Sequence, residues 1–134
     1  MPNAARLVLV VALVAAAALA GCRQAELPEN GGVDRDVAAG RRIFERKCVS
    51  CHNRNGDGKT IVAGHFPNAN LIDGLWRGDR SAASIEHQIR AGHDPMPKFE
   101  GKLTDEEIRQ TVAYVQELAR RAEARAASAT PAGR

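Results

Sequence analysis

The chain has 134 residues, 26% of them charged, and a formal net charge of +3 at pH 7. This length indicates a single domain. The charge is close to balanced and the sequence shows no basic patch with interleaved aromatic side chains, so the composition gives no indication of nucleic-acid binding.

The first 21 residues have the pattern of a bacterial secretory leader. Arg6 supplies a positive charge, and Leu7 to Ala20 form an unbroken apolar run. The run is shorter than the roughly 20 residues of a membrane-spanning helix, but it suits a secretory signal. Leu19-Ala20-Gly21-Cys22 resembles the lipobox of bacterial lipoproteins. We predict a lipoprotein signal peptide over residues 1–21 and lipidation at Cys22, with an ordinary signal peptide or an uncleaved anchor as alternatives.

Residues 22–35 form the next segment. They include Pro28, Gly31 and Gly32 and show no apolar periodicity, which is typical of a flexible linker. We predict that this segment tethers a folded domain, residues 36–120, to the lipid on Cys22.

A first helix is predicted to begin near Asp36, which suits an N-cap. Val37, Gly40, Phe44 and Cys48 are spaced along one face of this helix. Gly40 lowers the helix propensity by about 1 kcal/mol relative to Ala. The glycine is either required because a second helix passes closely, or merely tolerated.

The helix leads into Cys48-Val49-Ser50-Cys51-His52, a C-x-x-C-H motif typical of covalent c-type haem attachment. Each thiol adds to one vinyl group of the haem, and the histidine lies beneath the iron. A zinc site would need further ligands, but the sequence has no second cysteine pair and no H-x-x-x-H. A thioredoxin-like dithiol would need a βαβ context. A structural disulfide between Cys48 and Cys51 is the remaining alternative.

The stretch from Asn53 to Asn70 is rich in glycine and is predicted to be a loop. A haem offers a large, flat apolar surface on which such a loop can pack, which would explain why the domain has few aromatic residues. Leu71 to Trp76 adds apolar side chains that we expect to exclude water.

A short helix is predicted after Ser81, its candidate N-cap, with Ile85 and Ile89 on its buried face and Gly92 at its end. Asp94-Pro95-Met96-Pro97 must then be extended or turned, because both prolines restrict their neighbours. We predict a rigid loop that fixes the direction of the methionine side chain.

The last helix is predicted to begin with a capping box of Thr104 and Glu107 and a hydrophobic staple of Leu103 and Ile108. Residues 121–134 form an Ala/Arg-rich tail that we expect to extend the helix briefly and then fray. The predicted buried stripe of the helix consists of Ile108, Val112, Val115 and Ala119, with Tyr114 and Leu118 on its flank.

The order of these elements is helix, C-x-x-C-H, glycine-rich loop, short helix, Met-Pro and final helix. Over residues 37–119 the chain resembles a class I cytochrome c of the small bacterial kind. Gly40 and Phe44 resemble the positions where the N-terminal helix crosses the C-terminal helix, and Tyr114 resembles the aromatic residue that meets them. The implied fold is all-α, with crossing terminal helices and with loops and short helices wrapped around one covalent haem. A weaker similarity to haem domains of cbb3-type oxidase subunits rests on Trp76, Ile89, Gly92, Met96, Leu103 and Tyr114.

The resemblance implies that Cys48 and Cys51 hold the haem, that His52 is the proximal iron ligand and that Met96 is the distal ligand. Met96 is the only methionine left once the leader is removed, and Met/His ligation raises the reduction potential. Two competing interpretations are that Met96 fills the core, or that His93 replaces it and gives a bis-histidine haem of lower potential.

The second ring nitrogen of His52 is expected to donate to a backbone carbonyl, which fixes the tautomer. In the family a proline carbonyl often accepts this hydrogen bond. Pro67 is the candidate by residue type, whereas the family's Pro-x-Leu pattern aligns with Ala69. Both acceptors stay open.

A six-coordinate haem has no open site for a substrate, so we expect an electron-transfer protein and no enzyme. We predict a lipid-anchored carrier on the periplasmic side of the cell envelope. Its partners would be a membrane oxidase, reductase or dehydrogenase, without nucleic acid or a small-molecule substrate. The competing hypotheses are a permanently bound haem subunit of such a complex and a haem enzyme or gas sensor. We predict one of two roles for the basic residues near the motif: a positive rim that attracts an acidic partner, or ordinary solvated charge. These residues are Arg41, Arg42, Arg46, Lys47, Arg54 and Lys59.

Overall fold

The structure is a computed structural model that describes residues 30–74 and 79–129. The predicted signal peptide, the lipidation site Cys22 and Trp76 lie outside these residues. No helix of the described part combines the length and the apolar character needed to cross a membrane. The regular elements within it are helical, which confirms the predicted all-α class. In chain order they are α2 (Asn30–Lys47), α3 (Val49–His52), the 3-10 turns η1 (Ala63–His65) and η2 (Pro67–Ala69), α4 (Ala82–Ala91) and α5 (Asp105–Ala129).

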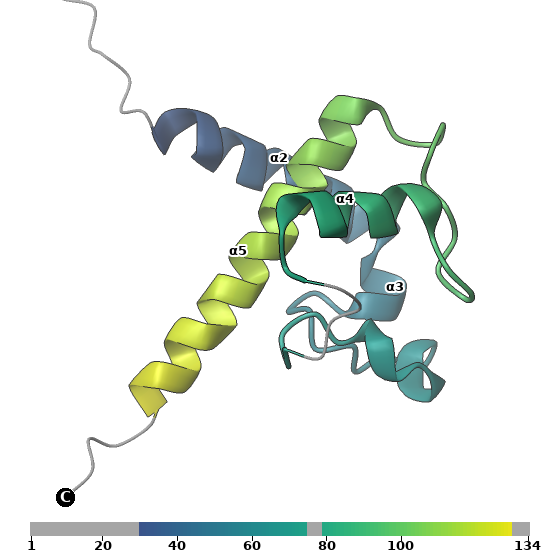
Figure 1. The fold of residues 1–134 in the computed structure, drawn as a ribbon. Coiled ribbons are helices and arrows are strands. Elements are labelled where there is room, and N and C mark those ends of the chain that lie inside the picture. The colour runs from purple at the N-terminus through teal and green to yellow at the C-terminus, as the bar shows by residue number, and fades with distance from the viewer. Residues whose placement is uncertain (1–29, 75–78, 130–134) are drawn as a thin grey trace, which may run out of the picture.

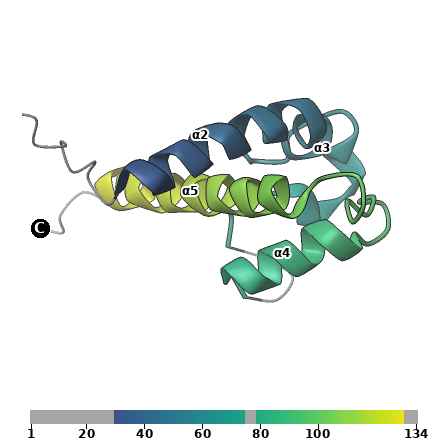
Figure 2. The same ribbon diagram turned by 90° about the horizontal axis from the view of Figure 1, so that it is seen from above.

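The long helices α2 and α5 cross, and α4 packs against α5 from a different side (Figures 1 and 2). Gly40 of α2 lies at the crossing. A Cβ atom at this position would overlap the backbone carbonyl of Gln110 and lie 3.0 Å from the Cβ of Tyr114. The close approach of the two helices therefore requires Gly40, and the glycine is not merely tolerated.

The hydrophobic core lies between α2, α4 and α5. Phe44 is 1% exposed, and its ring meets that of Tyr114 edge to face, with 5.2 Å between the ring centroids. Thr111 is also buried, and its hydroxyl donates to the carbonyl of Glu107 at 2.7 Å, a role that the apolar pattern does not predict. The predicted buried stripe of α5 is confirmed, since the structure buries Ile108, Val112, Val115 and Ala119.

The predicted starts of α4 and α5 are confirmed by hydrogen bonds. The backbone N–H of Thr104 donates to the Glu107 carboxylate at 2.9 Å, and the N–H of Glu107 donates to the Thr104 hydroxyl at 3.1 Å. At the start of α4, the N–H of Ser84 donates to the Ser81 hydroxyl at 3.1 Å. Gly92 ends α4 with φ of 63°.

The start of α2 differs from the prediction. The helix begins at Asn30 and not near Asp36, so the last residues of the predicted tether are helical. Asp36 does not act as an N-cap, because its carboxylate accepts a hydrogen bond from the Arg109 guanidinium of α5 at 2.7 Å. This ion pair joins the two long helices on one side of their crossing.

The end of α5 also differs, because the helix continues to Ala129 through most of the predicted tail. Alanine and arginine favour the helix, and charged side chains add support along its exposed surface. Glu117 pairs with both Arg120 and Arg121. These interactions lie within one or two turns, so they extend the helix beyond the part that packs on the core.

The predicted loop after α3 contains the two 3-10 turns and is ordered by one carboxylate. Asp57 accepts hydrogen bonds from the side chain of Asn53 at 2.7 Å, the side chain of Asn55 at 2.9 Å and the backbone N–H of Lys59 at 2.9 Å. These bonds lower the pKa of Asp57, the backbone bond from Lys59 most strongly. The carboxylate thus holds residues 53–59 in a compact turn.

Candidate functional site

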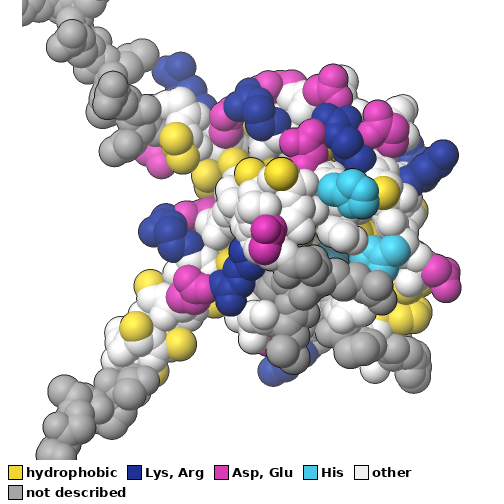
Figure 3. All heavy atoms as spheres, viewed as in Figure 1, with side chains coloured by type: hydrophobic (Ala, Val, Ile, Leu, Met, Phe, Trp, Pro, Cys, Tyr) yellow, Lys and Arg dark blue, Asp and Glu magenta, His cyan; other side chains and the backbone are white. Residues whose placement is uncertain are grey.

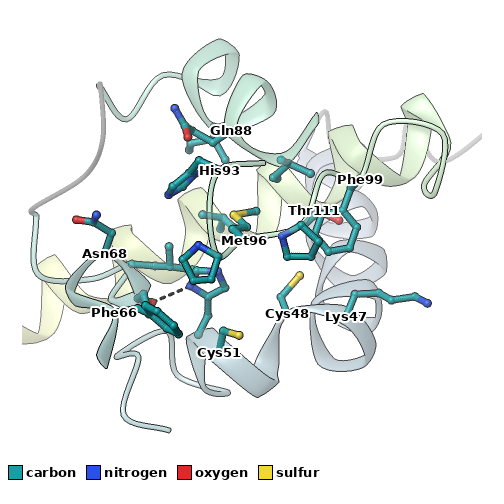
Figure 4. A pocket seen from close by; sticks show the side chains of 18 of the residues that line it. Lys47, Cys48, Cys51, Phe66, Asn68, Gln88, His93, Met96, Phe99 and Thr111 are labelled. Carbon is teal, nitrogen blue, oxygen red and sulfur yellow. Dashed lines mark hydrogen bonds between the residues drawn. The ribbon is translucent and has the colours of Figure 1, made fainter. Parts of the chain in front are cut away.

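A cavity of about 390 Å³ lies between α3, the loop that follows it, α4 and the segment before α5 (Figure 4). Its volume is within the range of about 300–1,000 Å³ that is typical of ligand sites. The side chains of Phe44, Phe66 and Leu71 contribute apolar wall. The cavity is also lined by the four residues that the sequence predicts for a haem site, Cys48, Cys51, His52 and Met96.

The single turn α3 brings the C-x-x-C-H motif to this cavity. The backbone N–H groups of Cys51 and His52 both donate to the carbonyl of Cys48, at 3.2 and 2.9 Å. Residues three and four apart on a helix share one face, so all three side chains reach the same space. Both cysteines are free thiols in the structure, which disfavours the structural disulfide.

The chemistry of the thiols also disfavours a redox dithiol. Burial raises the pKa of Cys48 to about 11, and Cys51 acts in the same direction. A redox dithiol works through a thiolate of lowered pKa, which is the opposite shift. Within residues 30–74 and 79–129, no group of three or more His, Cys, Asp or Glu side chains is placed to hold a metal ion, so the zinc interpretation gains no support.

The imidazole of His52 is oriented by the chain segment that follows the loop. Its Nδ1 lies 2.7 Å from the carbonyl oxygen of Ala69, and this bond requires the proton on Nδ1 and leaves a lone pair on Nε2. The alignment-based acceptor, Ala69, is therefore correct. Pro67 is the first residue of the turn η2, and this turn places the Ala69 carbonyl beside the imidazole ring.

The pKa of His52 is lowered chiefly by burial, with the hydrogen bond to Ala69 acting in the opposite direction and His93 lowering it further. A lowered pKa keeps the imidazole neutral, which is the form that binds a metal.

The segment of Met96 is attached to the end of α4 by backbone hydrogen bonds. The N–H of His93 donates to the carbonyl of Met96 at 3.0 Å, and the N–H of Phe99 donates to the carbonyl of Ile89 at 3.1 Å. A Cβ atom on Gly92 would lie 2.7 Å from the Met96 carbonyl oxygen, so the tight turn needs glycine there. The predicted turn is present, and Met96 packs against the core.

Arg90 is a residue of this region that the sequence does not single out. Its guanidinium pairs with Glu86 of α4 at 2.7 Å, with Glu100 at 3.2 Å and with Asp105 at the start of α5 at 2.8 Å. The three carboxylates flank the Met96 segment along the chain. Only the Glu86 pair has a recognisable i,i+4 spacing, so the other two contacts need the folded chain.

The six basic residues near the motif do not form a uniform positive rim. Arg41 pairs with Glu45 at 3.1 Å, and Arg46 and Lys47 lie close enough to Glu107 to lower its pKa. Lys47 also lines the cavity. In the view of Figure 3, basic and acidic side chains alternate over the surface. Arg41, Arg46 and Lys47 therefore lie beside acidic side chains, which weakens a positive rim at these three positions.

The chain is similar to known proteins in both sequence and fold. Residues 35–115 match the family model described as "Cytochrome C oxidase, cbb3-type, subunit III". The chain is 34% identical over 77 residues to cytochrome c6 of Euglena viridis, covering 58% of this chain and 86% of that protein. It is 33% identical over 84 residues to cytochrome c6 of Parathermosynechococcus lividus, covering 63% and 92%. A solved structure of cytochrome c6 from the diatom Phaeodactylum tricornutum matches with a TM-score of 0.56 at 35% identity, over 65% of this chain and 98% of that one.

Proposed function

This chain belongs to the cytochrome c family, and from that premise we propose that Cys48 and Cys51 hold its haem, with His52 and Met96 as iron ligands. The family assignment makes the chain a monohaem electron carrier with a covalently bound c-type haem and redox protein partners, and not an enzyme. The observation that supports the ligand assignment is the presence of all four side chains on the wall of one cavity.

The residues present fit a haem. The two thiols project from one turn of helix, as attachment to two vinyl groups of one ring requires. His52 is held neutral with Nδ1 bonded to Ala69, so Nε2 is available to iron. Met96 offers a thioether from a loop that is attached at both ends.

When bound, the haem supplies a one-electron couple between ferric and ferrous iron. His52 and Met96 would hold the iron; these ligands and the burial of the site would set the potential, which a methionine thioether raises. The buried side chains of Phe44, Ile85 and Val115 form part of the cavity wall and limit access of water. The segments that carry His52 and Met96 are held by hydrogen bonds, which would limit structural change on electron transfer.

For cellular context, we propose a lipid anchor on Cys22 and a place on the periplasmic side of the cell envelope. The support is the lipobox-like Leu19-Ala20-Gly21-Cys22 after an apolar run, and the third cysteine, which the haem does not use. Two or more acyl chains anchor a protein stably. We propose that the anchored carrier passes electrons between respiratory complexes.

A second candidate function is a permanently bound haem subunit of a membrane oxidase or dehydrogenase. The match to a family model described as an oxidase subunit favours it, whereas the similarity to cytochromes c6 along most of their length favours the free carrier.

One purification tests both the covalent attachment of haem and the lipid anchor. The full chain is expressed in a bacterium that matures c-type cytochromes, extracted in detergent and compared with Cys22→Ser and with Cys48→Ala/Cys51→Ala. We expect wild type in the membrane fraction as a monomer, with haem that stays on the chain in a denaturing gel. Cys22→Ser should be released in soluble form with its haem, and the double variant should lose covalent haem. Co-purification in a stable complex would favour the subunit, and a soluble wild type would refute the anchor.

A further inference from the structure

We propose that His93 is a second distal iron ligand, which takes the position of Met96 when the methionine thioether leaves the iron. This inference rests on the proposed haem site and adds to it a state with a different ligand set. It starts from a side chain for which the proposed function has no use.

The His93 imidazole belongs to the wall of the haem cavity, together with His52 and Met96 (Figure 4). Its Nδ1 is buried and has no hydrogen-bond partner among the described residues. Buried polar atoms without a partner are uncommon in native proteins. This nitrogen faces protein and not the open cavity, and no side-chain hydrogen bond among the described residues holds the imidazole in this orientation. Rotation of the side chain would bring a ring nitrogen to the iron.

His93 and Met96 are the two ends of one tight turn. The backbone N–H of His93 donates to the carbonyl of Met96 at 3.0 Å, and Asp94 and Pro95 between them are exposed. Because the turn has solvent on its outer side, one side chain can move toward the cavity as the other moves away without displacing a helix.

The backbone hydrogen bonds outside the turn can persist when His93 replaces Met96. Phe99 donates to the carbonyl of Ile89 at 3.1 Å, and Glu100 donates to that of Arg90 at 3.2 Å, so both bonds lie outside the residues that need to move. The exchange is therefore a local rearrangement of the turn.

The exchange conserves atoms and electrons. The bond between iron and the Met96 sulfur breaks, a bond between iron and a His93 nitrogen forms with the lone pair of the neutral imidazole, and the iron keeps its oxidation state. Two imidazole ligands give a lower reduction potential than one imidazole and one thioether. The carrier in its His93 state would no longer accept electrons from a donor matched to the Met96 state.

The test uses ferric holoprotein and reads the ligand set by absorption and electron paramagnetic resonance. Wild type should show the far-red charge-transfer band of methionine ligation. Met96→Ala should lose this band but stay low-spin with a bis-histidine signature and a lower potential. Met96→Ala/His93→Gln should become high-spin. The matched control is Met96→Ala/His87→Gln, which changes an exposed histidine of α4 and should remain low-spin.

The outcomes separate the inference from the proposed function. If wild type has the methionine band and Met96→Ala is high-spin, the inference fails and the Met96 assignment stands. If Met96→Ala/His93→Gln remains low-spin, another side chain is the substitute and the inference also fails. If wild type lacks the methionine band, the ligand assignment under the proposed function fails, and the inference fails with it.

A second measurement leaves Met96 in place. Ferric wild type is titrated with urea below the global unfolding transition, with far-ultraviolet circular dichroism as the measure of folding. We expect the methionine band to disappear while the haem stays low-spin, whereas His93→Gln should become high-spin over the same range. Identical behaviour of the two proteins would contradict the exchange.

Discussion

The ring of Phe44 lies 6.3 Å, centroid to centroid, from the imidazole of His52. The same phenyl ring meets Tyr114 of α5 edge to face. One buried side chain therefore connects the crossing of the two long helices with the proposed proximal ligand. Packing at the crossing and orientation of the imidazole are expected to respond together when this ring is changed.

The coupling between Phe44 and Tyr114 can be measured in a double-mutant cycle of Phe44→Leu, Tyr114→Leu and the double variant. An edge-to-face pair contributes about 0.5–1.5 kcal/mol beyond its buried area, so the double variant should lose that much less stability than the sum of the two single variants. Urea unfolding of the holoprotein measures the difference. Additive losses would show that the two rings contribute only through burial.

Substitution of Gly40 by alanine should destabilise the fold. The added Cβ would overlap the carbonyl of Gln110, and overpacking typically costs about 1–3 kcal/mol. Gly32→Ala in the same helix is the matched control, because nothing lies within 4 Å of its Cβ position. It should stabilise α2 by up to about 1 kcal/mol through helix propensity. A Gly40→Ala protein as stable as wild type would contradict the close crossing.

Loss of Arg90 should loosen the Met96 segment. Arg90→Ala removes the shared partner of Glu86, Glu100 and Asp105, so the methionine band should disappear at a lower urea concentration than in wild type. Arg90→Lys should restore part of the loss, since lysine keeps the charge but cannot form the same fork of hydrogen bonds. Arg42→Ala, at an exposed arginine of α2, should leave the band unchanged. If Arg90→Ala and Arg42→Ala had equal effects, the ion pairs of Arg90 would have no specific role in holding the Met96 segment.

The capping box predicts a pH dependence of stability. Hydrogen bonds from the Thr104 backbone and hydroxyl hold the pKa of Glu107 below its usual range, with a smaller contribution from nearby Arg46 and Lys47. A lowered pKa in the folded state means that the carboxylate contributes stability above the ordinary glutamate pKa of about 4.3. This contribution is lost as the pH falls through the lowered value.

The comparison of wild type with Glu107→Gln isolates this contribution. The urea midpoint of wild type should fall more steeply between neutral pH and about pH 3, and the two proteins should converge at the acid end. Asp34→Asn, at an exposed residue of α2, serves as the control and should follow wild type. A constant offset between wild type and Glu107→Gln across the whole range would exclude titration of Glu107 as the cause.

Features encoded by neighbouring residues could be predicted from the chain alone. The C-x-x-C-H motif, the capping box at Thr104 and the buried stripe from Ile108 to Ala119 each depend on spacing within a few residues. The structure confirms the capping box and the stripe, and it places the residues of the motif on the wall of one cavity. The ends of α2 and α5 were less predictable. Asp36 resembles an N-cap until Arg109, far along the chain, engages its carboxylate.

Contacts between distant residues account for the rest. The choice of Ala69 over Pro67 as the partner of His52 depends on the path of the loop and on the turn η2. The pairs of Arg90 with Glu100 and Asp105 and the buried nitrogen of His93 likewise appear only when α4, the Met96 turn and α5 are brought together. Short-range periodicity thus specifies the cofactor chemistry and the helices. Packing between distant segments specifies how His52 is oriented and which residues hold the Met96 turn, because those properties depend on distances in space that no local spacing encodes.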